Sequence, residues 1–362
     1  MMEPISITNL SWSYKGIDGA SSAHELRQAR VILQRELQKS MSASLSLVEW
    51  YEMVNELHDR IARKAVELCI QGMVEEGFGQ PPVPYAFIVF GSSGREEATL
   101  WSDQDNGMII SDAPHATKEE YFNELGNRIA DLLEELGYAK CEGKVMCSES
   151  LWRKTLADWK KQLLEWSSDL NWEPVRNLII ASDMRFITGE ESLAEAWLTS
   201  FYEQFRRVPE LSDAVLRNTV KHKATLNIMG RVVTERFGEH AGGFDVKYGV
   251  YIPLVNSARF LALQHGIQES STLKRMERLS SLEAIPFQLT DTCQRAFTSA
   301  LKLRRNTPVV IREDLQQSSG FLDEKQMKQK QTHYELRETL GLVKRVHRAL
   351  QRQLRFAERR RP

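Results

Sequence analysis

The chain has 362 residues, of which 42% are hydrophobic and 27% are charged. This composition excludes collagen-like, disordered and disulfide-scaffold proteins, and the length is enough for two or three packed units. Lys and Arg number 48 against 49 for Asp and Glu, so a net charge of −1 predicts no attraction of the whole chain to nucleic acid or to an anionic membrane. The charge is uneven, because 12 basic and 5 acidic residues follow position 320 and give that segment a charge of +7.

The cysteines and the apolar runs indicate the compartment. Cys69, Cys141, Cys147 and Cys293 form no C-x-x-C pair and have no histidine at metal-ligand spacing. No apolar run approaches the roughly 18 residues of a membrane helix, and the N-terminus lacks the pattern of a signal peptide. We therefore expect a cytoplasmic protein with free thiols and no membrane partner.

The residue pattern of the first half of the chain predicts mixed α and β structure. Residues 22–75 contain no proline and one glycine, and their apolar positions fall mostly three or four apart, which predicts helices. Glycines and prolines between 77 and 84 predict a boundary. The apolar run 86–90 predicts a buried strand, and the segments 105–110 and 177–181 predict a second and a third, with helices between and after them.

The residue pattern of the second half predicts mainly helical structure. Trp152, Trp159 and Trp166 follow one another at seven-residue intervals and predict a packing seam on a helix over 151–164. We expect three further helices at 254–263, 273–282 and 293–303. A final helix over 336–354 has one apolar stripe and basic residues on its other faces, so it is either a solvated helix packed by the stripe or a surface for nucleic acid or another partner.

The most informative segment begins where the first strand ends. Gly91 permits a sharp backbone turn, and Ser92 together with the N–H groups that follow can surround a phosphate. Arg95 adds a planar fork of donors that suits phosphate oxygens. These residues predict a phosphate-binding turn.

Two carboxylates follow this turn. Asp103 and Asp105 are two residues apart at the start of the second strand, so their side chains point to the same face. Unpaired, they would repel each other, and a divalent cation removes that conflict. Oxygen ligands of this kind favour Mg²⁺ or Mn²⁺. A phosphate-binding turn followed by Asp-x-Asp supplies the groups that nucleotidyl transfer requires, since metal ions there stabilise the attacking and leaving oxygens.

The run from Gly91 to Gly107, G-S-S-G-R-E-E-A-T-L-W-S-D-Q-D-N-G, resembles the signature of the DNA polymerase beta nucleotidyltransferase superfamily. It is most similar to bacterial nucleotidyltransferases related to the protein-PII uridylyltransferases and the glutamine synthetase adenylyltransferases. The similarity continues at 181–189, which resembles the family's D-x-R-x-x-x-G element, and at 244–275, which resembles its helical substrate-binding domain. The resemblance implies an α+β fold in which a mixed sheet with helices is flanked by an N-terminal helical segment and a C-terminal all-helical domain.

The resemblance also assigns site residues. It implies that the triphosphate of an NTP is bound by the turn, at Gly91, Ser92, Gly94 and Arg95. Asp103 and Asp105 would be catalytic and hold Mg²⁺ or Mn²⁺. The superfamily adds a third carboxylate, for which Asp183 is the candidate and Glu142 the competitor; a structural ion pair of Asp183 with Arg185 is the alternative. Contacts to nucleotide or acceptor, or alternatively plain ion pairs, are expected at Lys144, Arg185, Lys247, Arg259 and Arg275.

We expect four parts: an N-terminal helical segment (1–75), a catalytic domain (76–190), a helical substrate-binding domain (191–310) and a basic C-terminal helix packed on it (311–362). The expected activity is transfer of NMP from an NTP to an acceptor with release of pyrophosphate. The resemblance favours a protein acceptor, as in signalling by protein-PII uridylyltransferases. The alternatives are a catalytically inactive nucleotide-binding regulatory module and a small-molecule acceptor. We do not expect nucleic acid as the acceptor, because the acidic body would repel it; the residues leave the nucleotide and the oligomeric state open.

Overall fold

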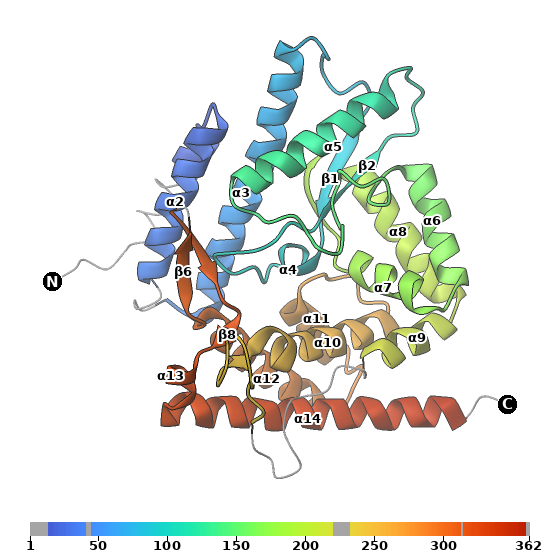
Figure 1. Cartoon of the computed structure of the whole chain (residues 1–362). Helices are drawn as coiled ribbons and strands as arrows, with labels where there is room; N and C mark the ends of the chain where they lie inside the picture. Colours follow the sequence, from blue (N-terminus) through green and yellow to red (C-terminus); the bar gives the residue numbers. More distant parts are fainter. Residues whose placement is uncertain (1–13, 41–44, 220–231, 313, 360–362) are drawn as a thin grey trace. The chain divides into compact units, whose positions relative to one another are not determined.

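The computed structural model describes residues 14–40, 45–219, 232–312 and 314–359 (Figure 1). Two compact units are present, and each is discontinuous in sequence. The first contains Met1–Gln162, Asp183–Ser200 and Ile311–Gln317, and the second contains Leu163–Ser182, Phe201–Val310 and Ser318–Pro362. Among the described residues, no helix has the length and apolar character needed to cross a membrane. The predicted α+β class is confirmed, whereas the four-part division stays a prediction.

A four-stranded mixed sheet organises the first unit. Its order is β3-β2-β1-β4, with strands β1 (Tyr85–Val89), β2 (Asn106–Ile110), β3 (Arg153–Thr155) and β4 (Arg185–Gly189). β1 is antiparallel to both β2 and β4, and β3 runs parallel to β2. Val89 pairs with Asn106 on one side and with Arg185 on the other. The segments that enter β2 and β4 therefore both lie at the C-terminal end of β1.

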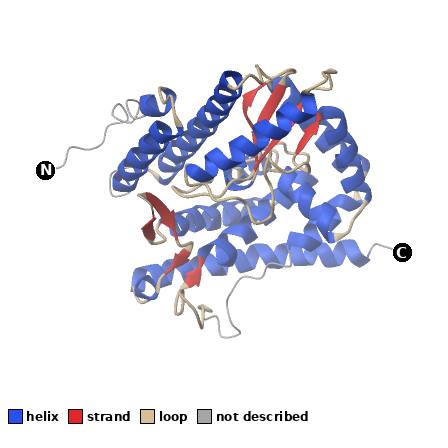
Figure 2. Ribbon diagram, turned by 45° about the horizontal axis from the view of Figure 1, so that its top comes forward, coloured by secondary structure: helices blue, strands red, loops and turns tan. Residues whose placement is uncertain are grey.

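Helices pack around this sheet, as Figure 2 shows with the strands in red. α3 (Leu47–Glu75) lies against β4 and packs on α5 (Lys118–Glu135), and α2 (Ala23–Ser40) packs on α3 and α5. α6 (Leu156–Ser168) begins where β3 ends, and α8 (Glu191–Arg207) follows β4. α3 begins at a capping box in which Ser46 and Glu49 bind each other's backbone N–H. Its apolar residues Val54, Leu57 and Ile61 are fully buried at helical spacing. The helices predicted within 22–75 are confirmed as α2 and α3, with 41–44 outside the described residues, and the strands expected at 86–90 and 105–110 are confirmed to within a residue.

The prediction of a strand at 177–181 is wrong. This run is the C-terminal half of helix α7 (Trp172–Ala181), and the strand is β4, four residues further on. A short apolar run is equally compatible with a buried strand and with a buried helix. Here Pro174 stands in the first turn, where proline is tolerated, and Val175, Leu178 and Ala181 are buried at the three-residue spacing of a helix.

The tryptophan segment is also partly different from its prediction. Residues 153–155 form β3 beside β2, so the helix begins only at Leu156. Trp152, Trp159 and Trp166 are all buried, which confirms their role in packing. The ring centroids of Trp152 and Trp159 are 6.1 Å apart, and the indole N–H of Trp159 donates to the carbonyl of Met108.

The second unit is mainly helical. Its remaining elements are α9 (Glu210–Thr219), the π-helix η1 (Lys247–Tyr251), α10 (Ile252–Gln264), α11 (Thr272–Ser281), α12 (Phe287–Arg305), α13 (Glu324–Met327) and α14 (Lys330–Arg359). The four helices predicted beyond residue 250 are confirmed as α10, α11, α12 and α14. Two small sheets were not predicted: they pair β5 (Phe244–Asp245) with β8 (Phe321–Leu322) and β6 (Val309–Arg312) with β7 (Leu315–Ser318).

Candidate functional site

The chain turns sharply where β1 ends. The one-turn helix α4 (Gly91–Gly94) follows Phe90, whose N–H donates to the carbonyl of Asp105 at 2.9 Å. Gly91 has a φ of +57°, which costs a residue with a side chain about 1–2 kcal/mol. A Cβ at this position would lie 2.1 Å from Oδ2 of Asp105. Glycine is therefore required both by the turn and by the carboxylate that lies against it.

The carbonyl groups and the N–H groups of this turn lie in different environments. The carbonyls of Phe90, Gly91 and Ser92 accept hydrogen bonds from N–H groups at residues 94, 95 and 97, at 2.8–3.1 Å. The carbonyl of Ser93 accepts a side-chain donor at 2.8 Å. Among the described residues, the N–H groups of 91–93 have no such acceptor. The turn therefore presents donors, which is the polarity that an anion requires.

Asp103 and Asp105 lie in the extended segment that leads into β2. Gln104 between them is 3% exposed, and its amide donates to the carbonyls of Ala130 and Tyr138. Both aspartates are partly exposed. Because successive side chains of an extended segment point to opposite sides, the two carboxylates share the open side, as their spacing predicts.

A small cavity of about 40 Å³ opens beside these carboxylates. Its polar lining includes Asp59 from α3, Ser93 from the turn, and Asp103 and Asp105. Within the described residues, no three His, Cys, Asp or Glu side chains form a group that could hold a metal ion.

The hydroxyl of Ser92 connects the turn to the aspartate segment. Its Oγ lies 3.2 Å from the Oγ of Ser102, the residue before Asp103. A hydroxyl carries one donor and two acceptor positions. Ser92 is partly exposed and keeps hydrogen-bonding capacity for a ligand oxygen.

The segment 139–145 runs alongside the aspartates, because the N–H groups of Gln104 and Asn106 each donate to it at 3.0 Å. The loop that it forms carries Glu142 and Lys144, and both side chains are exposed. Lys144 has a φ of +55° at the end of this loop. The backbone therefore brings Lys144 and Glu142 to the neighbourhood of the aspartate segment.

Cys141 in the same loop faces one of the aspartates. Burial, and to a lesser extent the negative charge of Asp105, raises the pKa of its thiol to about 12. The thiol is therefore protonated at neutral pH. It is a neutral neighbour of the carboxylate, since a thiolate here would add a second negative charge.

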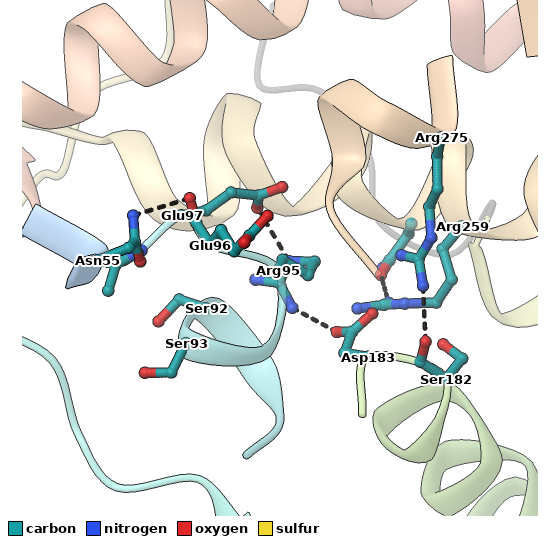
Figure 3. Close-up of polar contacts among 12 residues, drawn as sticks. Asn55, Ser92, Ser93, Arg95, Glu96, Glu97, Ser182, Asp183, Arg259 and Arg275 are labelled. Carbon is teal, nitrogen blue, oxygen red and sulfur yellow. Dashed lines mark hydrogen bonds and ion pairs between the residues drawn. The ribbon is translucent and has the colours of Figure 1, made fainter. Parts of the chain in front are cut away.

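Arg95 lies in a buried ion-pair cluster (Figure 3). Its Nε donates to Glu97 at 2.9 Å, and its Nη1 donates to the carboxylate of Asp183. Arg95 is 4% exposed and Asp183 is 1% exposed. A Cβ on Gly94 would lie 2.0 Å from the carbonyl oxygen of Asp183, so Gly94 permits the close approach of the two segments. Phosphate binding by Arg95 and catalysis by Asp183 stay predictions; in this arrangement each side chain neutralises the other.

Arg185 pairs with Asp59 of α3 in place of Asp183. Its two terminal nitrogens donate to the two carboxylate oxygens of Asp59 at 2.6 and 2.7 Å. The same guanidinium donates to the carbonyl of Ser93 at 2.8 Å. Arg185 therefore ties the entry of β4 to both α3 and the turn after β1, and sequence reasoning did not identify Asp59.

Asn55 holds the loop after the turn in its conformation. Its amide nitrogen donates to the carbonyl of Glu96 at 2.8 Å, and its Oδ1 accepts from the N–H of Ala98 at 3.1 Å (Figure 3). Glu96 between these contacts has a φ of +59°, which is unfavourable for glutamate. The contacts of Asn55 compensate for this strain.

His58 binds the same loop one turn further along α3. Its Nε2 lies 2.7 Å from the carbonyl of Thr99, and its Nδ1 lies 2.7 Å from the hydroxyl of Tyr138. Because a carbonyl only accepts, Nε2 carries the proton and Nδ1 accepts from the tyrosine. Burial, with the nearby charge of Arg30, lowers the pKa of His58 to about 3, so the ring is neutral.

Asn55, His58 and Asp59 share one face of α3, since they are three and four residues apart. Together they contact the loop 96–99 and the entry of β4. In the sequence, the sign of such a role is that Asn55 and His58 are polar residues within the otherwise apolar, buried stripe of α3. We call these three residues the α3 clamp.

In the second unit, Arg275 is fully buried. Its Nε donates to the carbonyl of Glu269 and its Nη2 donates to the carbonyl of Ser182, both at 2.7 Å (Figure 3). Ser182 follows the last residue of α7. Arg275 therefore caps the C-terminal end of that helix, where a cation is favoured.

Arg259 and Lys247 differ in access to solvent. Arg259 is 5% exposed, and its Nη1 donates to Oδ1 of Asn256 at 2.6 Å. Lys247 is partly exposed, with its Nζ 5.7 Å from the ring centroid of Tyr248. Contacts of these residues with nucleotide or acceptor stay predictions.

Two family models match the chain. Residues 32–173 match the one described as "Putative nucleotidyltransferase DUF294", and residues 209–354 match the one described as "Putative nucleotidyltransferase substrate binding domain". No curated protein matches. The first match contains α3, the turn and both aspartates, and the second contains α10 to α12 and most of α14. A kinship with nucleotidyltransferases is thereby confirmed, whereas a closer relation to the protein-PII uridylyltransferases stays a prediction.

Proposed function

From the premise that the chain belongs to the DUF294 nucleotidyltransferase family, we propose that it transfers NMP from an NTP to an acceptor and releases pyrophosphate. The observation that carries the proposal is the contact between the turn and Asp105. A turn with N–H groups open to an anion lies directly against a partly exposed carboxylate. Phosphate and cation would therefore be bound side by side, as NTP chemistry requires.

The donor set fits Mg²⁺ or Mn²⁺. Mg²⁺ is usually bound by one or two carboxylates plus substrate phosphates and water. Asp103 and Asp105 would supply the two carboxylates, and among the described residues no group of three His, Cys, Asp or Glu side chains forms a complete protein site. When bound, such an ion supplies positive charge that stabilises the attacking and leaving oxygens.

The turn would bind the triphosphate. The N–H groups of 91–93 and the hydroxyl of Ser92 are donors that need no rearrangement to meet phosphate oxygens, because the carbonyls of the turn are already engaged. Donors held in place in advance are effective at stabilising developing negative charge. Arg95 would act mainly by holding Asp183, and Lys144 on the neighbouring loop could approach a phosphate as a point charge.

The same proposal includes a binding site for the acceptor in the second unit. The match of residues 209–354 to a substrate-binding domain supports binding of the acceptor by the second unit. A protein acceptor, as in protein-PII-type signalling, rests on the resemblance of the sequence alone. A cytoplasmic location rests on the four cysteines, all of which are free thiols among the described residues.

The proposal is tested by pyrophosphate release from each of the four NTPs in Mg²⁺ or Mn²⁺, with and without cell extract as a source of acceptor. Asp103→Asn and Asp105→Asn should abolish release. Asp112→Asn is the matched control, because Asp112 is exposed beyond the other end of β2 and an asparagine can still accept from the N–H of Ala157. Base-labelled NTP identifies the acceptor. Absence of release by the wild-type chain in every condition, with NTP still bound, would instead support a regulatory module.

A further inference from the structure

Helix α14, the red helix that ends near the C-terminus in Figure 1, carries a row of arginines. Five exposed arginines follow one another at intervals of three and four residues, namely Arg345, Arg348, Arg352, Arg355 and Arg359. At 3.6 residues per turn they fall within a sector of about 80°, and they span about 21 Å of the helix. We call these five residues the arginine row.

Among the described side chains, no acidic residue pairs with the arginine row. Within the described part of the chain, none of its members forms an ion pair, and α14 itself contains no acid between 339 and 357. The acids nearer its start are engaged elsewhere, since Glu335 pairs with Lys302 and Glu338 pairs with Arg295, both on α12. Among the described side chains, no carboxylate is therefore paired with these five neighbouring guanidinium groups, which repel one another.

The other face of α14 is fixed by packing. Its apolar residues on the side opposite the arginine row are buried, namely Leu336, Leu340, Val343, Val346 and Leu350. The helix is therefore anchored, and the arginine row is presented to solvent on a rigid support. A ligand would not have to order the helix in order to bind to it.

The chemistry of the row favours phosphates. All five residues are arginine, whose planar fork binds phosphate oxygens in pairs, and none is lysine. The span of about 21 Å matches about six consecutive phosphates of one nucleic acid strand at 3.4 Å each. A membrane is a poorer match, because a helix on a bilayer inserts its apolar face and here that face is buried in the protein. Phe356 alone is a large exposed apolar side chain beside the row.

We propose that the arginine row binds the phosphate backbone of nucleic acid without sequence preference. This inference is independent of the nucleotidyl transfer proposed above, and it concerns a bound polyanion and not the acceptor. The net charge of −1 predicts no attraction of the whole chain to nucleic acid. Binding is nevertheless expected here, because it depends on the local charge of the arginine row.

The test is fluorescence anisotropy of the full chain with a labelled 20-nucleotide RNA of mixed sequence and with a duplex DNA of equal length, titrated with salt. If all five guanidinium groups neutralise phosphates, log K should fall with log salt with a slope of about −3.5 for the single strand and about −4.5 for the duplex. Changing all five to glutamine should abolish most of this slope and weaken binding at low salt by roughly 100-fold or more.

A matched control removes the same charge elsewhere. Five exposed basic residues of the second unit without ion pairs are changed to glutamine, namely Arg206, Arg236, Arg278, Lys325 and Lys330. This variant should bind nearly as the wild type does, and circular dichroism should show both variants folded. Equal losses in the two variants, or no binding by the wild type, would overturn the proposal. So would tighter binding of polyglutamate or of phosphatidylserine vesicles than of either nucleic acid.

Discussion

The Gly91→Ala substitution should have two effects, strain in the backbone of the turn and displacement of the Asp105 carboxylate. The added Cβ would lie 2.1 Å from Oδ2 of Asp105, where ordinary contacts begin at 3.4 Å, so the oxygen must move by more than 1 Å. A misplacement of about 1 Å in an active site can reduce the rate by roughly 100-fold. The φ of +57° adds a loss of about 1–2 kcal/mol in the free energy of unfolding. Urea unfolding measures the stability, and pyrophosphate release measures the rate.

Gly79→Ala is the control for this experiment. Gly79 also has a positive φ, +77°, but a Cβ there meets nothing within 4 Å. Both variants should lose similar stability, whereas only Gly91→Ala should lose about 100-fold in release. Release by Gly91→Ala within about threefold of wild type, or an equal loss in Gly79→Ala, would refute the placement of Asp105 at the reacting centre.

The α3 clamp gives three further predictions. Asn55→Ala should lower the free energy of unfolding by about 1–3 kcal/mol, because it leaves a buried N–H and a partly buried carbonyl without their partner; a loss below about 0.5 kcal/mol in urea unfolding would contradict this. His58 has a folded pKa of about 3, so the unfolded chain binds the proton first, and stability should fall as the pH drops from about 6.5 towards 3, by up to about 1.4 kcal/mol per pH unit. His58→Gln should flatten this dependence in urea titrations between pH 7.5 and 5. Asp59→Asn should destabilise the chain by about 1–3 kcal/mol, since Arg185 loses its carboxylate, and an unchanged urea midpoint would count against that pairing.

The centre of the candidate site could be predicted because its geometry is local. The turn at Gly91 follows a buried strand of distinctive composition, and the period of two fixes Asp103 and Asp105 on one side. Antiparallel pairing of β1 with β2 then brings the turn and the aspartates together, as Val89 opposite Asn106 shows. Nothing beyond short-range pattern is needed for this part.

Other parts depend on tertiary contacts that leave no periodic signal. The run 177–181 is apolar in either a strand or a helix, and only the burial of one helix face distinguishes the two. Arg95 was expected to face phosphate because of its chemistry, but a single sequence does not tell that Asp183, 88 residues later, lies within hydrogen-bonding reach. Asp59 was missed for the same reason, since its partner Arg185 is 126 residues away.

The contacts of α3 explain why the turn presents donors and not acceptors. A peptide turn is useful to an anion only if its carbonyls are directed elsewhere. The carbonyl of Ser93 is occupied by Arg185, and Arg185 is oriented in turn by both oxygens of Asp59. The loop that continues from the turn is fixed by Asn55 and His58 from the same helix. The polarity of the turn is therefore set in part by a helix more than thirty residues earlier, and α3 is a structural part of the site.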